Sequence, residues 1–159
     1  MPIIVDGYNL LRFVEGSDEG NGVMTDVQLC MYLDKYLKLI NEKGLIVFDG
    51  TGPPDKTGFD NMSRLEILFS GQNKDADFVI ENKIKLNTAA KFLTVVSSDR
   101  KIRSAAMAKK ATSVKSDQFW ADMQHQLNRK REQRDPGEKQ YGLNEGETEQ
   151  WMKIFGIEQ

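Results

Sequence analysis

The feature that most constrains the fold of this 159-residue chain is a series of short, mainly apolar runs separated by segments of helical periodicity. Strands that are buried on both faces show uninterrupted apolar runs, whereas half-exposed strands alternate apolar and polar residues. The pattern therefore predicts a mainly parallel sheet with helices on both faces, an α/β fold of the doubly wound type. We expect its strands at residues 2–5, 45–48, 65–69, 92–96 and 112–115.

The segments between these runs carry apolar residues three and four positions apart, which is typical of amphipathic helices. One helix is expected over residues 25–43, with Thr25 as its N-cap and Gly44 as its C-cap. Further helices are expected from Asp75 to about Leu86, over about 100–110, and from Ser116 to about Arg131.

The composition, with 39% hydrophobic and 29% charged residues, fits one folded domain with a sizeable core. No apolar run is long enough to span a bilayer, the first residues do not resemble a signal peptide, and the single cysteine allows no internal disulfide. We therefore expect a cytoplasmic protein without a membrane partner. Its domain is expected over residues 1–127, followed by a polar linker over 128–147 and a short amphipathic helix over 148–159.

Several acidic residues fall where a parallel sheet would bring them together. Asp6, Asp49 and Asp99 follow the first, second and fourth expected strands, and Asp6-Gly7 reads as the turn that ends the first strand. Asp77 and Glu81 are four residues apart and so share a face of the helix after the third strand. Because ligands of doubly wound sheets bind beyond the carboxyl ends of the strands, these carboxylates are expected to converge on one pocket.

Carboxylates that share a pocket repel one another, by roughly 3 kcal/mol for two charges ~5 Å apart at an effective dielectric constant near 20. Protons or a divalent cation must relieve this repulsion. All-oxygen ligands suit Mg²⁺ or Mn²⁺ better than Zn²⁺, and such a metal supports phosphodiester hydrolysis. An aspartate before a glycine is also common in turns, so Asp49-Gly50 taken alone fits a purely structural role as well.

The other charged residues limit which catalytic and binding mechanisms are possible. The only histidine, His125, lies on an expected helix away from the strand ends, so it is not a candidate general base. The net charge of −2 argues against binding nucleic acid by bulk positive charge. Basic residues are nevertheless concentrated from Arg100 to Lys115, where no acid occurs. Lys109 and Lys110 are therefore candidates for holding an RNA backbone, with a solvated helix face as the alternative.

A different chemistry is suggested by the segment 47–51, Val-Phe-Asp-Gly-Thr, which resembles the signature of haloacid dehalogenase-type phosphatases. That signature requires a nucleophilic aspartate two residues before its second aspartate. Val47 occupies this position here, and Ile4 occupies the corresponding position before Asp6. The missing nucleophile disfavours this class, and the absence of glycine-rich phosphate loops leaves nucleotide cofactors unsupported.

The segment 3–9, Ile-Ile-Val-Asp-Gly-Tyr-Asn, resembles the opening of NYN domains, in particular the YacP-like branch of the PIN-like nuclease superfamily. Further matching segments follow in the same order at residues 47–49, 76–81, 95–100 and 116–119. The resemblance covers about residues 1–125. It implies a Rossmann-like, PIN-like fold and a metal-dependent endoribonuclease that cleaves RNA phosphodiester bonds.

Carried over by position, the resemblance implies roles for individual residues. Asp6, Asp77 and Asp99 would be the central ligands of Mg²⁺ or Mn²⁺, and Asp49 and Glu81 would complete the acidic ring. Asn9 would help to position water or phosphate. Substrate phosphates would be contacted by Ser98 and Arg100, with Arg103, Lys109 and Lys110 from the basic segment as further RNA-binding candidates.

The alternative to an enzyme is a non-catalytic RNA-binding or ribosome-associated module that keeps the same fold. If the chain were such a module, some of the acidic residues implied by the resemblance should be replaced. All of them are present here, which favours the enzyme. Tyr8 and Phe13 are candidates for stacking on RNA bases, although packing in the core is the commoner role for such residues.

Overall fold

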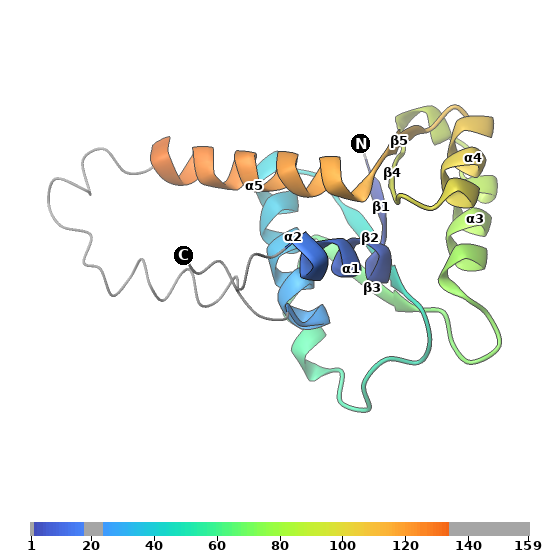
Figure 1. Ribbon diagram of the computed structural model, residues 1–159, viewed down its shortest axis with the longest axis horizontal. Coiled ribbons are helices and arrows are strands. Elements are labelled where there is room, and N and C mark those ends of the chain that lie inside the picture. Colours follow the sequence, from blue (N-terminus) through green and yellow to red (C-terminus); the bar gives the residue numbers. More distant parts are fainter. Residues whose placement is uncertain (1, 18–23, 134–159) are drawn as a thin grey trace, which may run out of the picture.

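The computed structural model describes residues 2–17 and 24–133 (Figure 1). In this part of the chain, five strands form one sheet in the order β3-β2-β1-β4-β5, and every neighbouring pair is parallel. The prediction of a parallel α/β sheet is thus confirmed. The strands are β1 (Ile3–Asp6), β2 (Gly44–Phe48), β3 (Leu65–Phe69), β4 (Thr94–Val96) and β5 (Thr112–Val114).

Helices cover both faces of the sheet. One face carries α1 (Gly7–Ser17), α2 (Asp26–Ile40) and α5 (Ser116–Gln133), and the other carries α3 (Ala76–Leu86) and α4 (Arg100–Ala108) (Figure 1). Two short 3₁₀ helices, Thr57–Phe59 and Ala90–Phe92, lie in the loops before β3 and β4. None of the helices in the described residues is long and apolar enough to cross a membrane.

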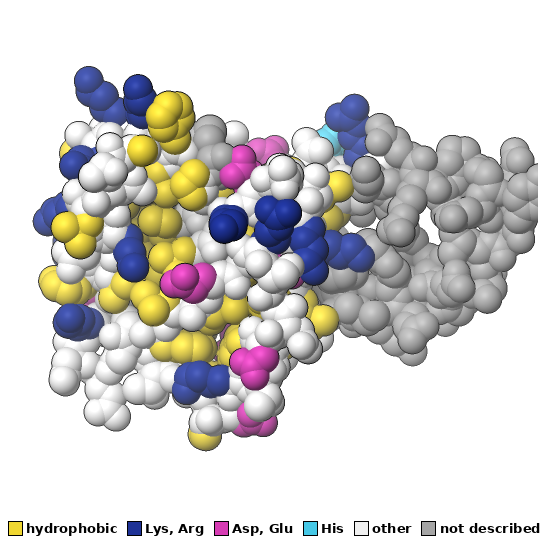
Figure 2. Space-filling model, turned by 180° about the vertical axis from the view of Figure 1, so that it is seen from behind, with side chains coloured by type: hydrophobic (Ala, Val, Ile, Leu, Met, Phe, Trp, Pro, Cys, Tyr) yellow, Lys and Arg dark blue, Asp and Glu magenta, His cyan; other side chains and the backbone are white. Residues whose placement is uncertain are grey.

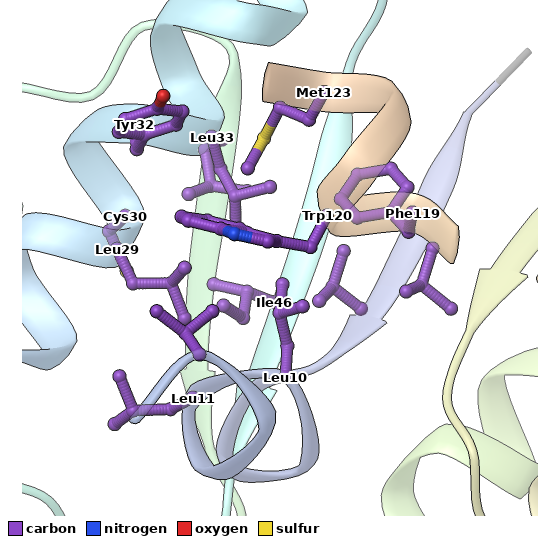
Figure 3. Close-up of a cluster of buried hydrophobic side chains, with 14 of the residues drawn as sticks. Leu10, Leu11, Leu29, Cys30, Tyr32, Leu33, Ile46, Phe119, Trp120 and Met123 are labelled. Carbon is purple, nitrogen blue, oxygen red and sulfur yellow. The ribbon is translucent and has the colours of Figure 1, made fainter. Parts of the chain in front are cut away.

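Strands β1 to β4 each supply both cores because neighbouring side chains point to opposite faces of a sheet. Val5 packs with α1, α2 and α5, whereas Ile4 packs with α3 and α4. In the first core the rings of Tyr32 and Trp120 lie 5.2 Å apart between α2 and α5, and Leu10 of α1 is close to this layer (Figure 3). Full burial of each large apolar side chain contributes about 1.5–3 kcal/mol, which fixes the helices against the sheet.

Helix α1 was not expected from the sequence, in which Asp6-Gly7 reads as a turn. The chain instead passes directly from β1 into the helix at Gly7. A Cβ atom at Gly7 would lie 2.5 Å from Cδ1 of Phe48 and 2.9 Å from the carbonyl oxygen of Val47. The glycine is therefore required by the close approach of β2 rather than by a turn.

Other boundaries also differ from the sequence-based expectations. Helix α2 begins after Thr25 as predicted, but Gly44 does not cap it: Asn41 is the C-cap, with a left-handed φ of 56°, and Gly44 opens β2. Phe92 belongs to a 3₁₀ helix, and β4 is correspondingly shorter than expected. Helix α5 continues to Gln133, so the expected linker at 128–147 begins as helix. The rest of that linker and the helix expected over 148–159 lie outside the described residues.

Candidate active site at the carboxyl edge of the sheet

The strand order reverses direction between β1 and β4, and this switch point is where doubly wound sheets bind their ligands. Asp6 is the last residue of β1 and lies on one side of the switch point. Asp99 lies on the other side, where it follows β4 and caps the N-terminus of α4. The paired register of β1 and β4 thus brings these two acids, 93 positions apart, to the same sheet edge.

Asp6 is an acid in an unusually buried position, with 6% of its surface exposed. Its Oδ2 accepts a 2.9 Å hydrogen bond from the hydroxyl of Ser97, and its carboxylate also accepts the backbone N–H of Asn9 in α1. Burial raises the pKa of Asp6 to about 6, and the charges of Asp77 and Asp99 add to this rise against the opposing hydrogen bonds. Asp6 is therefore a carboxylate whose negative charge is only partly compensated by the protein.

Asp77 lies in the first turn of α3 and is partly exposed. Its pKa is also raised, first by partial burial, then by the charges of Asp99, Asp75 and Glu81, while Lys101 opposes the rise. Asp99 therefore acts on both Asp6 and Asp77. Asp6 of β1, Asp77 of α3 and Asp99 between β4 and α4 therefore form one electrostatically coupled group of carboxylates, as the spacing predicts.

The donor chemistry of this group fits a hard divalent cation, since it consists of carboxylate oxygens with uncompensated repulsion. The side chains are not preorganised for it, however. Across residues 2–17 and 24–133, no group of three or more His, Cys, Asp or Glu side chains is arranged so that it could hold a metal ion as it stands.

Two other predicted ligands are engaged in contacts between elements. Oδ1 of Asp49 accepts the backbone N–H of Ala76 at 3.1 Å and the hydroxyl of Ser70 at 3.3 Å, so it ties the end of β2 to the start of α3. Glu81 lies one turn after Asp77 and pairs with Lys101 of α4 at 4.0 Å. These contacts give both acids structural roles beside the coupled group.

Asn9 lies at the centre of a second polar network. Its Oδ1 accepts the N–H of Ser98 at 3.0 Å and the hydroxyl of Ser116 at 2.6 Å. The N–H of Ser116 in turn donates to the Ser98 hydroxyl at 3.1 Å. The amide oxygen is thus committed to the protein, which leaves the Asn9 Nδ2 group as the available donor. Ser98, expected to face phosphate, is exposed, and its hydroxyl oxygen accepts a bond within this network.

Two serines of the site were not singled out as site residues. Ser97 and Ser116 are both buried, and each bonds to a candidate site residue. The only indication in the sequence is the position of each serine, because Ser97 directly follows an apolar strand and Ser116 begins a helix. Serine at such positions is so often a cap that the pattern alone does not reveal the partner.

The basic candidates separate into two groups along α4. Arg100 begins the helix next to Asp99 and is exposed, and Arg103 lies one turn further on. Lys109 and Lys110 follow the other end of the nine-residue helix, about 14 Å from its start at ~1.5 Å per residue. Along α4, the two arginines therefore lie nearer to Asp99 than the two lysines do.

The remaining aromatic and histidine candidates lie apart from the coupled acids or pack into the protein. Tyr8 packs against Phe48, with ring centroids 5.0 Å apart, and burial raises its pKa. Phe13 is half-buried against the first core. His125 is exposed on α5.

Comparison with known proteins links this architecture to one family. Residues 3–155 match the family model of the YacP-like NYN domain, which extends beyond the resemblance seen over residues 1–125. The crystal structure of Rae1 (YacP) from Bacillus subtilis is similar, with a TM-score of 0.67 and 20% identity. The alignment covers 98% of this chain and 92% of that one. A W164L mutant of the same protein aligns with equal identity and coverage and a TM-score of 0.64. No curated protein matches the chain in sequence.

Proposed function

Because the chain belongs to the YacP-like NYN family of PIN-like nucleases, we propose that it is a metal-dependent endoribonuclease. The observation that carries the proposal is the coupling of Asp6, Asp77 and Asp99 at the switch point of the sheet. An acid as buried as Asp6 is costly to keep charged, and the charges of Asp77 and Asp99 add to this cost, which the bonds from Ser97 and the Asn9 N–H only partly offset. A cation-binding role accounts for this cost.

In this proposal Asp6, Asp77 and Asp99 hold Mg²⁺ or Mn²⁺. The bound ion would supply Lewis acidity toward the scissile phosphate and make water a better nucleophile. Ser97 fixes the orientation of the Asp6 carboxylate through its 2.9 Å hydrogen bond. The Asn9 Nδ2 group, oriented by the two bonds to its Oδ1, donates to water or to a phosphate oxygen. Arg100 offers its exposed guanidinium to the RNA backbone.

The competing proposal is a non-catalytic RNA-binding or ribosome-associated module. It needs no coupled carboxylates, and repulsion among them would oppose the approach of a polyanion when no cation is bound. The buried state of Asp6 is therefore the specific observation that favours the enzyme.

The test is cleavage of a circular, internally labelled RNA in Mg²⁺ or Mn²⁺, because a circle has no ends and only endonucleases open it. We expect the wild type to linearise the circle and Asp6→Asn to be slower by orders of magnitude, since the carboxamide keeps the size of the side chain but removes its charge. Asp60→Asn removes an equivalent charge from an exposed position in the loop between β2 and β3 and serves as the matched control.

The outcomes separate the two proposals. Cleavage by the wild type and Asp60→Asn, but not by Asp6→Asn, supports the nuclease. If both metals leave a broad panel of circular RNAs intact while RNA still binds, the non-catalytic module is the better account. Equal cleavage by Asp6→Asn would show that the catalytic residues lie in another part of the chain.

A further inference from the structure

A second charged surface lies at the opposite edge of the sheet from the acids. It comprises the lysines at the ends of α3 and α4 and before β4, together with three exposed apolar side chains. We call it the amino-edge surface, and it consists of Lys83, Lys85, Leu86, Lys91, Phe92, Met107, Lys109 and Lys110. Leu86 is 81% exposed, Met107 64% and Phe92 54%.

The topology explains why these residues share one edge. Helices α3 and α4 each connect parallel strands, so both run back from the carboxyl edge and end at the amino edge. Leu93, directly after Phe92, accepts a 2.9 Å hydrogen bond from the N–H of Thr112, which lies two residues after Lys110. The segment before β4 and the end of α4 are therefore side by side. Figure 2 shows Lys or Arg and hydrophobic side chains interleaved on the side of the molecule that α3 and α4 occupy.

The charge of this region contrasts with the acidic chain as a whole. From Lys83 to Lys115 there are nine lysines and arginines, five of which belong to this surface, and one acid, Asp99, at the other edge of the sheet. In the described residues none of the five lysines of the amino-edge surface forms an ion pair. Five unneutralised positive charges on a protein of net charge −2 indicate an anionic partner for this face.

The backbone at Lys110 gives an independent indication. Lys110 adopts a left-handed conformation with φ of 62°, and the next residue, Ala111, donates its N–H back to the carbonyl of Ala106. This is the position after a helix where glycine or asparagine is usual, because a side chain with a Cβ is strained there. A lysine at this position adds charge to the surface at a cost to folding.

We propose that the amino-edge surface binds a single-stranded segment of the RNA that occupies the active site. The proposal rests on the proposed function and extends its footprint to a second contact. The lysines would bind phosphates, and the exposed ring of Phe92, with Lys91 Nζ 5.0 Å from its centroid, would stack on an unpaired base. Helix α4 separates the two sites by about 14 Å, a distance that a short single strand of a few nucleotides can span.

The test measures binding of a fluorescein-labelled 20-nucleotide poly-U RNA in chelator, where cleavage does not interfere. In one variant Lys91, Lys109 and Lys110 are replaced by Gln, and in the matched control Arg12, Lys56 and Arg129 are replaced by Gln. All six side chains are exposed, and both variants lose three charges. We expect the first variant to lose about 2 from the slope of log affinity against log salt, at ~0.7 per phosphate contact, and the control to lose far less.

A further variant tests the aromatic part of the surface. Phe92→Leu keeps an apolar side chain without the ring, and we expect it to bind poly-U about five-fold more weakly or worse.

Equal slopes for the triple variant and its control would overturn the inference whatever the cleavage assay shows. Loss of slope in the triple variant without any cleavage by the wild type would support this surface and contradict the nuclease. If the same three lysines instead govern binding to phosphatidylserine vesicles, with poly-U binding unaffected, the surface serves a membrane and the inference is wrong.

Discussion

The hydroxyl of Ser97 donates a 2.9 Å hydrogen bond to Oδ2 of Asp6, and both residues are buried. The same hydroxyl accepts the backbone N–H of Asp99 at 3.0 Å. One side chain therefore connects the carboxylate at the end of β1 to the backbone that positions the acid at the start of α4. The separation of these two acids depends on it, and so would any ion held between them.

Ser97→Ala should affect both stability and activity. It leaves the part-buried Asp99 N–H and one Asp6 oxygen without this partner, so we expect a loss of about 1–3 kcal/mol in the free energy of unfolding at neutral pH. The Ser97 bond lowers the pKa of Asp6, so that pKa should rise further. RNA cleavage should fall about 10–100-fold, as is typical when a partner of a metal ligand is removed. Ser97→Thr retains a hydroxyl and should recover much of the rate; equal defects in the Ala and Thr variants would argue against a positioning role.

The raised pKa of Asp6 predicts a pH dependence of stability in metal-free protein. Folding favours the protonated acid, so its contribution to stability is complete below the unfolded pKa of 3.8 and is lost as pH rises through about 6. Asp6→Asn removes this loss. In chelator the variant should gain on the wild type between pH 4 and 7, by up to roughly 3 kcal/mol for a shift of about two pKa units. Denaturant melts across this range measure the difference, and parallel curves would show that Asp6 is not strained in its charged form.

The sequence predicted the strands well because a doubly buried strand leaves an apolar run that few other elements produce. It also predicted that Asp6 and Asp99 meet, since both follow strands whose ends share an edge. Helix α1 was missed because Gly7 satisfies two explanations, a turn and a close approach to Phe48, and only the packing of β2 distinguishes them.

Contacts that depend on side-chain direction could not be predicted in the same way. Asp49 follows a strand just as Asp6 does, yet its carboxylate turns to the backbone of Ala76. Lys109 and Arg100 belong to one basic segment in the sequence, but the length of α4 places them at opposite edges of the sheet. Spacing along the sequence therefore shows which residues follow a strand or share a segment, but not which way a carboxylate turns or which edge of the sheet a basic residue reaches.

Asp49→Asn should distinguish a structural acid from a metal ligand. The carboxamide oxygen can still accept the Ala76 N–H, but without the negative charge that strengthens this bond at the N-terminus of α3. We expect a loss of about 0.5–1.5 kcal/mol in stability and a rate of RNA cleavage at least ten-fold higher than that of Asp99→Asn. The two variants are compared at a temperature where both remain folded. A cleavage defect in Asp49→Asn as deep as that of Asp99→Asn would return Asp49 to the set of metal ligands.

Lys110→Gly should increase stability while it weakens RNA binding, a combination that a merely solvated lysine does not produce. Glycine relieves the left-handed strain of about 1–2 kcal/mol, whereas loss of the lysine charge beside the C-terminus of α4 removes about 0.3–1 kcal/mol of stabilisation. The expected net gain in stability is therefore between about 0 and 1.7 kcal/mol. Lys109→Gly is the matched control, because its φ of −97° offers no strain to relieve and the substitution should only destabilise. Each variant should lower the salt dependence of poly-U binding by about 0.7, the value for one phosphate contact. If Lys110→Gly is more stable but binds poly-U like the wild type, the strained lysine has no part in RNA binding; if it is less stable, the backbone argument itself is wrong.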